Sequence, residues 1–153
     1  MKIREITEAF NHPQKPKSDQ IFGDLETEYN VQDLLDYATH NLPIRKIPLS
    51  LLIKNTPPFS LPGTSDEEDN SPEFRQRTAG LTLRDYLSSK YPPILVIKTT
   101  SGKYDVADGR HRVVNFVHLL TLAHKNPLKQ TVSGFVMDQR ILNNISTIAK
   151  KNE

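Results

Sequence analysis

Apolar residues recur with helical spacing in four segments of the chain, which predicts four helices. They are residues 31–41, 83–89, 113–123 and 139–149. Asn30 and Thr82 stand before the first two segments and are suited to cap their helices. Apolar residues cover most of the circumference of the third, so it is expected to be the buried central helix. We expect Tyr86 and Tyr91 to lie in the core or at a hinge.

Short apolar or alternating runs predict the strands. They are residues 45–53, 94–97, 104–106 and 131–137. The turn residues 100–103 join the second and third runs into a hairpin. Pro48 interrupts the first run early, which is typical of an edge strand or of a strand start. Together with the helices, these strands predict an α+β fold, with a small mixed sheet around the central helix.

Two proline-rich segments are expected to lie outside the regular elements. Residues 1–20 are predicted to be a flexible N-terminal arm that can dock a protein partner, and residues 21–153 to form the domain. The second segment, residues 55–78, has the length of a functional lid or a disordered insertion.

Some charged residues at the long loop have two interpretations. Lys54, Arg75 and Arg77 flank or end the loop, and we interpret them as surface charges rather than as contacts to a nucleotide. The acidic residues 66–69 are more typical of a solvated loop than of a cation site. A metal site is therefore not assigned to any residue.

Composition narrows the classes of function. The chain has 153 residues, which fits one domain, and it has no cysteine, which excludes disulfides, thiolate metal sites and thiol catalysis. Its net charge of +2 argues against an extensive non-specific nucleic-acid surface. Apolar runs are too short to span a membrane, and the N-terminus lacks the apolar core of a signal peptide. We therefore expect a cytoplasmic protein with no membrane partner.

The strongest chemical signal is the sequence DGRHR at residues 108–112, between the hairpin and the third helix. A strand-to-helix turn presents backbone N–H groups and the positive end of the helix dipole, and guanidinium groups match phosphate oxygens. Cations are unfavourable at a helix N-terminus unless an anion is present. The pattern therefore predicts a phosphate site formed by Gly109, Arg110, His111 and Arg112. Asp108 is expected to cap the helix, and a role as general base or metal ligand is compatible with capping.

Three segments in this order resemble the ParB/sulfiredoxin superfamily. They are residues 47–53 (IPLSLLI), 92–97 (PPILVI) and 102–112 (GKYDVADGRHR), within a region of similarity at residues 45–138. The resemblance implies a nucleotide or phosphate held over the N-terminus of the central helix. Gly109 would then allow close backbone approach, while His111 and Arg112 would contact phosphates.

The branches of this superfamily differ in chemistry. Arg110 stands where sulfiredoxins carry their catalytic cysteine, which excludes that branch. The other members include CTP-hydrolysing partition proteins, ParB-like nucleases of phages and plasmids, and an amino-acid kinase. In the kinase an acid before the glycine serves the phosphoacceptor, and Asp108 matches it. Partition proteins carry a helix-turn-helix domain after this module, whereas only a short segment follows Met137 here, so centromere binding is not expected.

These observations favour an enzyme, a phosphohydrolase or DNA nuclease of the ParB-like type that binds a nucleotide or DNA. Asp108 and His111 are the candidate catalytic residues, and Mg²⁺ with a nucleoside triphosphate are the expected cofactors. Two alternatives stay open. One is a non-catalytic protein- or DNA-binding module that retains the fold. The other is a phosphotransferase acting on a small hydroxyl metabolite.

Overall fold

The structure is a computed structural model that describes residues 19–22, 25, 28–57, 59–61, 78 and 80–151, with side chains as far as residue 145. Of the arm predicted at residues 1–20, only Asp19 and Gln20 lie within this part of the chain. Most of the loop predicted at residues 55–78 lies outside it.

Four strands form the main sheet, in the order β3-β6-β4-β5. They are β3 (Arg45–Pro48), β6 (Thr131–Met137), β4 (Ile94–Lys98) and β5 (Tyr104–Asp108). β4 and β6 run parallel, whereas the β3–β6 and β4–β5 pairs are antiparallel. The chain passes from β5 to β6 through α6 (Arg110–Leu122). This mixed sheet with its helices confirms the predicted α+β class, the predicted hairpin and the predicted final strand.

The other helices are α2 (Val31–Asn41), α5 (Leu83–Leu87) and α7 (Gln139–Lys151). Both predicted caps are confirmed. The Asn30 side chain accepts a hydrogen bond from the backbone N–H of Asp33 at 3.1 Å. At α5, Thr82 and Asp85 accept hydrogen bonds from each other's backbone N–H groups, which completes a capping box.

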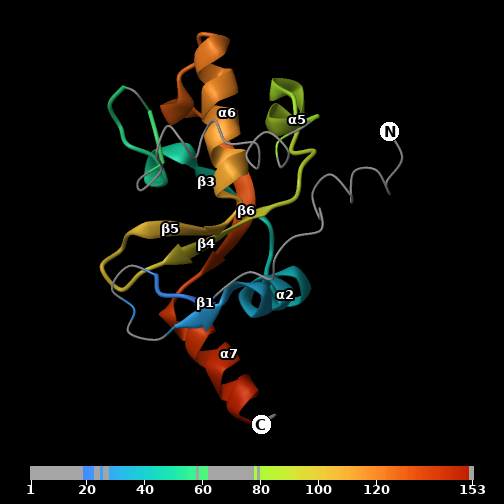
Figure 1. Cartoon of the computed structure of the whole chain (residues 1–153), viewed down its shortest axis with the longest axis vertical. Helices are drawn as coiled ribbons and strands as arrows, with labels where there is room; N and C mark the ends of the chain where they lie inside the picture. Colours follow the sequence, from blue (N-terminus) through green and yellow to red (C-terminus); the bar gives the residue numbers. More distant parts are fainter. Residues whose placement is uncertain are drawn as a thin grey trace.

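Side chains that alternate along β4 divide the core into two parts. Ile94 and Val96 pack among residues of β3, α5 and α6 and residues 49–53, while Leu95 and Ile97 pack against residues of α2 and α7. All four are 0% exposed, which explains the continuous apolar run, because a strand covered on both faces has no polar side. Figure 1 shows the two layers: α5 and α6 lie on one side of the sheet, and α2 and α7 lie on the other.

The strand predicted at residues 45–53 is shorter than expected. It ends at Pro48, and η1 (Leu49–Leu51), a single 3₁₀ turn, follows. Proline has no N–H for a strand ladder, so β3 ends there at the sheet edge. The turn buries Leu49 and Leu52 in the same part of the core, whereas a continued strand would have directed them to opposite faces of the sheet.

Two further parts of the chain differ from the prediction. α6 begins at Arg110, three residues before the predicted start at residue 113, and the short 3₁₀ segment η2 (Pro127–Lys129) follows it. A two-stranded sheet of β1 (Asp19–Gln20) and β2 (Tyr29–Asn30) precedes α2 and was not predicted. Pairs this short leave no alternation of apolar and polar residues in the sequence.

Candidate functional site

The turn between β5 and α6 depends on glycine. Gly109 is the N-cap residue of α6 and has a φ of 98°, in the left-handed region that L side chains rarely adopt. A Cβ atom at this position would lie 2.5 Å from Cγ2 of Ile94 and 2.8 Å from Nη2 of Arg112. The backbone therefore packs directly on β4 and on the Arg112 guanidinium, in a space that only glycine fits.

A β-bulge aims the last residue of β5. Val106 is paired with Val96, whereas Asp108 is paired with Leu95, so Ala107 is an additional residue on β5. Bulges bend a strand and redirect its side chains, and they are frequent beside functional sites. After the bulge, Asp108 is the last residue of β5, and its carboxylate contacts Arg112 in the first turn of α6.

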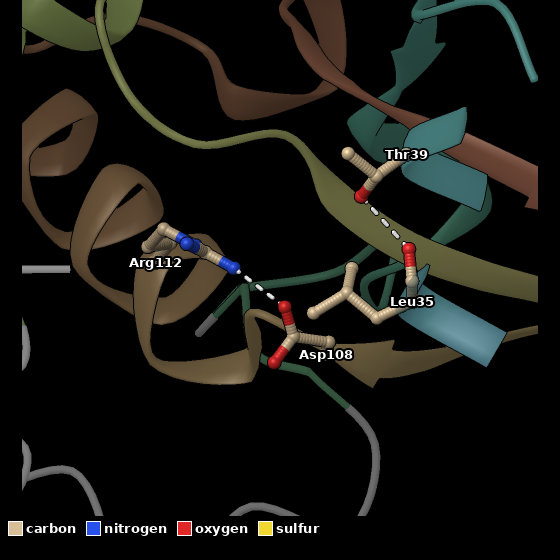
Figure 2. A network of polar contacts seen from close by, with 4 residues as sticks. All are labelled: Leu35, Thr39, Asp108 and Arg112. Atoms are coloured by element: carbon tan, nitrogen blue, oxygen red, sulfur yellow. Dashed lines mark hydrogen bonds and ion pairs between the residues drawn. The ribbon is translucent and has the colours of Figure 1, made fainter. Parts of the chain in front are cut away.

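Asp108 is not the N-cap residue of α6, which corrects the prediction. The N-cap position belongs to Gly109, which has no side chain to cap the helix. Asp108 comes one residue too early for that role, and its Oδ2 atom instead accepts a hydrogen bond from Nη2 of Arg112 at 3.0 Å. The side chains are 14% and 12% exposed, so this ion pair is largely screened from water (Figure 2).

Arg110 and His111 form the rest of the first turn of α6, and both are half-buried. This turn contains no acidic residue. The positive end of the helix dipole opposes cationic side chains at this place and favours an anion. Asp108 offsets the charge of Arg112 at this helix end. The residues predicted as a phosphate site are thus brought together at one helix end.

The C-terminal half of α2 lies beside the end of β5. Figure 2 shows Leu35 and Thr39 on the side of Asp108 opposite to Arg112, with the Leu35 side chain directed toward the carboxylate. The Thr39 hydroxyl donates a hydrogen bond to the backbone oxygen of Leu35 at 2.8 Å. An apolar side chain is therefore the nearest contribution of α2 to the Asp108 carboxylate in this view.

Two polar residues behind the turn were not predicted as part of the site. Tyr86 is 2% exposed and its hydroxyl accepts a hydrogen bond from Nδ2 of Asn115 at 2.8 Å. Burial raises the pKa of Tyr86 to about 12, against the opposing effects of the Asn115 hydrogen bond and the positive charge of Arg112. A signal for this group was present in the sequence: Asn115 is a polar residue within an apolar helix, one turn after Arg112.

The described residues offer limited means to hold a cation. They contain no group of three or more His, Asp or Glu side chains that could bind a metal ion. Mg²⁺ is often held by one or two carboxylates together with phosphate oxygens, so Asp108 fits a metal that arrives with a phosphate. Lys54 is exposed, while Arg75, Arg77 and the acidic residues 66–69 lie outside the described part of the chain.

Comparisons with protein-family models, curated proteins and solved structures find no significant match to this chain. The resemblance to the ParB/sulfiredoxin superfamily therefore stays a prediction that depends on the three sequence segments. Among the described residues, no helix has the length and apolar character needed to cross a membrane.

Proposed function

We propose that the β5–α6 turn binds a phosphate group, and that the chain is a ParB-like nucleotide-binding domain with phosphohydrolase or nuclease activity. The observation that supports this is the start of α6. Glycine replaces a capping side chain, and Arg110 and His111 stand in a first turn without an acidic residue. A bound anion would accept hydrogen bonds there and would neutralise the unfavourable charge.

The three basic residues have different roles in this proposal. Arg112 is 12% exposed, pairs with Asp108 and lies against Gly109, so it supports the turn from behind. Arg110 and His111 are half-buried, and in this proposal they are the side chains that contact the phosphate oxygens. In phosphoryl transfer, charge that develops on these oxygens is stabilised by positioned donors and cations. Mg²⁺ bound to the phosphate would add positive charge at the same oxygens.

A thermal-shift panel tests the binding step. ATP, CTP, GTP, ADP, inorganic phosphate and a short DNA are each added with and without Mg²⁺. A ligand at 100 times its Kd stabilises the folded protein by about 2.7 kcal/mol, which is a measurable rise in Tm. Arg110→Gln and His111→Gln should abolish the rise. Arg84→Gln should retain it, because Arg84 is an exposed arginine at the start of α5, a different helix. No rise with any ligand for the wild type would refute the proposal.

One observation favours the non-catalytic alternative. Oδ2 of Asp108 is already engaged by Arg112 at 3.0 Å, so a general base at this position must first give up that contact. The two functions differ in the effect of Asp108→Asn. If the chain is an enzyme, wild type turns over and this variant binds nucleotide without turnover. If it is a binding module, neither protein releases phosphate or cleaves DNA, although both bind.

A further inference from the structure

The first turns of α6 are linked to α5 by buried polar side chains. Arg112 and Asn115 are three residues apart and therefore lie on the same face of α6. Asn115 is 9% exposed and donates a hydrogen bond to the Tyr86 hydroxyl of α5 at 2.8 Å. Arg112 donates to Asp108 at 3.0 Å and its Nη2 atom packs against Gly109. The same helix face thus contacts α5 on one side and the β5–α6 turn on the other.

The Tyr86 ring is held independently of its hydroxyl. It stacks on Phe116 of α6, with ring centroids 4.9 Å apart and an angle of 7° between the planes. It also meets the Tyr91 ring at 5.2 Å and 48°. The positive charge of Arg112 lowers the pKa of the phenol against the larger effect of burial.

We propose that Tyr86 is a positioning residue for the phosphate site, because its hydroxyl orients the side chains of Asn115 and Arg112 and thereby the Asp108–Gly109 turn. This inference rests on the phosphate-binding function proposed above. The phenol oxygen accepts the hydrogen bond of the Asn115 amide. Its partial negative charge also attracts the positive charge of Arg112. A guanidinium held in this way keeps one orientation, and the ion pair with Asp108 then fixes the start of α6.

A pair of variants in the same aromatic cluster tests this inference. Tyr86→Phe removes the hydroxyl and keeps the ring stacking. Tyr91→Phe is the matched control, because its hydroxyl accepts a hydrogen bond from the backbone N–H of Ser133 at 2.7 Å, and Ser133 belongs to β6 and not to α6. Both variants lose one buried phenol hydrogen bond, so both should lower the Tm. Inorganic phosphate is titrated calorimetrically into each protein well below its Tm.

The expected result is that the Kd for phosphate rises up to about tenfold in Tyr86→Phe, as for the loss of one hydrogen bond between neutral groups, and stays near the wild-type value in Tyr91→Phe. In an Arg112→Lys background, Tyr86→Phe should have little further effect, since its influence passes through the guanidinium. Equal affinities of Tyr86→Phe and Tyr91→Phe would overturn the inference. If the effects of Tyr86→Phe and Arg112→Lys on the free energy of phosphate binding were fully additive, the inference would be overturned as well.

A second measurement separates this inference from the phosphate-binding function. Without any ligand, the backbone amide signals of Gly109 and Arg110 in ¹H–¹⁵N spectra should shift in Tyr86→Phe and not in Tyr91→Phe. If Tyr86→Phe does not fold, Asn115→Ala replaces it and should shift the same two signals. Unchanged signals in the folded variant refute the positioning role even if phosphate binds. Shifted signals in a protein that binds no phosphate support the positioning role and refute the proposed function.

Discussion

Substitution of Gly109 by alanine should be costly for two separate reasons. The φ of 98° places a non-glycine residue in the left-handed region, at a cost of about 1–2 kcal/mol. The added Cβ would lie 2.5 Å from Cγ2 of Ile94 and 2.8 Å from Nη2 of Arg112, and overpacking of a filled core costs about 1–3 kcal/mol. The free energy of unfolding of Gly109→Ala should therefore fall by about 2–5 kcal/mol.

Gly102 provides the control for this prediction. Its φ is 84°, and a Cβ atom there would meet nothing within 4 Å, so Gly102→Ala carries the backbone cost of about 1–2 kcal/mol alone. Urea unfolding of both variants measures the difference, which is the contribution of packing. Ile94→Ala should partly relieve the steric overlap that Gly109→Ala creates. The double variant should therefore lose less stability than the two single variants together. Equal losses for Gly102→Ala and Gly109→Ala would refute the tight packing of the turn.

Three further outcomes are expected. Asp108→Ala leaves Arg112 without its carboxylate partner and should lower the free energy of unfolding in urea by about 3 kcal/mol, whereas Asp108→Asn, which keeps an acceptor oxygen, should lose less. Thr82→Ala removes the capping box at α5 and should cost about 1 kcal/mol in the same assay, and an unchanged midpoint would contradict the cap. Tyr86 keeps its proton in the folded state up to a pKa of about 12 but releases it near 10 in the unfolded state, so stability should fall as the pH rises from 10 to 12, by about 3 kcal/mol. Tyr86→Phe should lack this part of the pH dependence, and a profile parallel to that of wild type would contradict the burial of the hydroxyl.

The elements that the sequence predicts well are those with a local signal. Asn30 and Thr82 mark their helix starts because a cap acts within one turn of the chain. The run at residues 94–97 is apolar at every position because each face of β4 meets a different helix layer. The 3₁₀ turn after Pro48 and the β1–β2 pair have no such signal. The 3₁₀ turn is held by a hydrogen bond from Leu49 to Gln130, far along the chain, and the two-residue strands of the pair are too short to show a periodicity.

The position of Asp108 shows why a motif alone does not assign roles. An acid before a helix is a good cap by propensity, but the bulge at Ala107 and the glycine at position 109 move the helix start one residue beyond its reach. The bulge is a property of the pairing of β4 with β5. It therefore cannot be derived from the five residues of the turn, which is why the cap was assigned to the wrong residue.

The three basic residues of the turn were predicted as one group, and helical spacing separates Arg112 from the other two. Position 112 lies one turn before Asn115 and Phe116, and one turn after Asp108, so it shares the buried face of α6. If the helix begins at Arg110, helical spacing from the buried residues identifies Arg112 as the side chain that faces inward. A guanidinium on that face must find a carboxylate, because a buried charge without a partner is costly. The Asp108–Arg112 pair is thus a requirement of folding at this helix end.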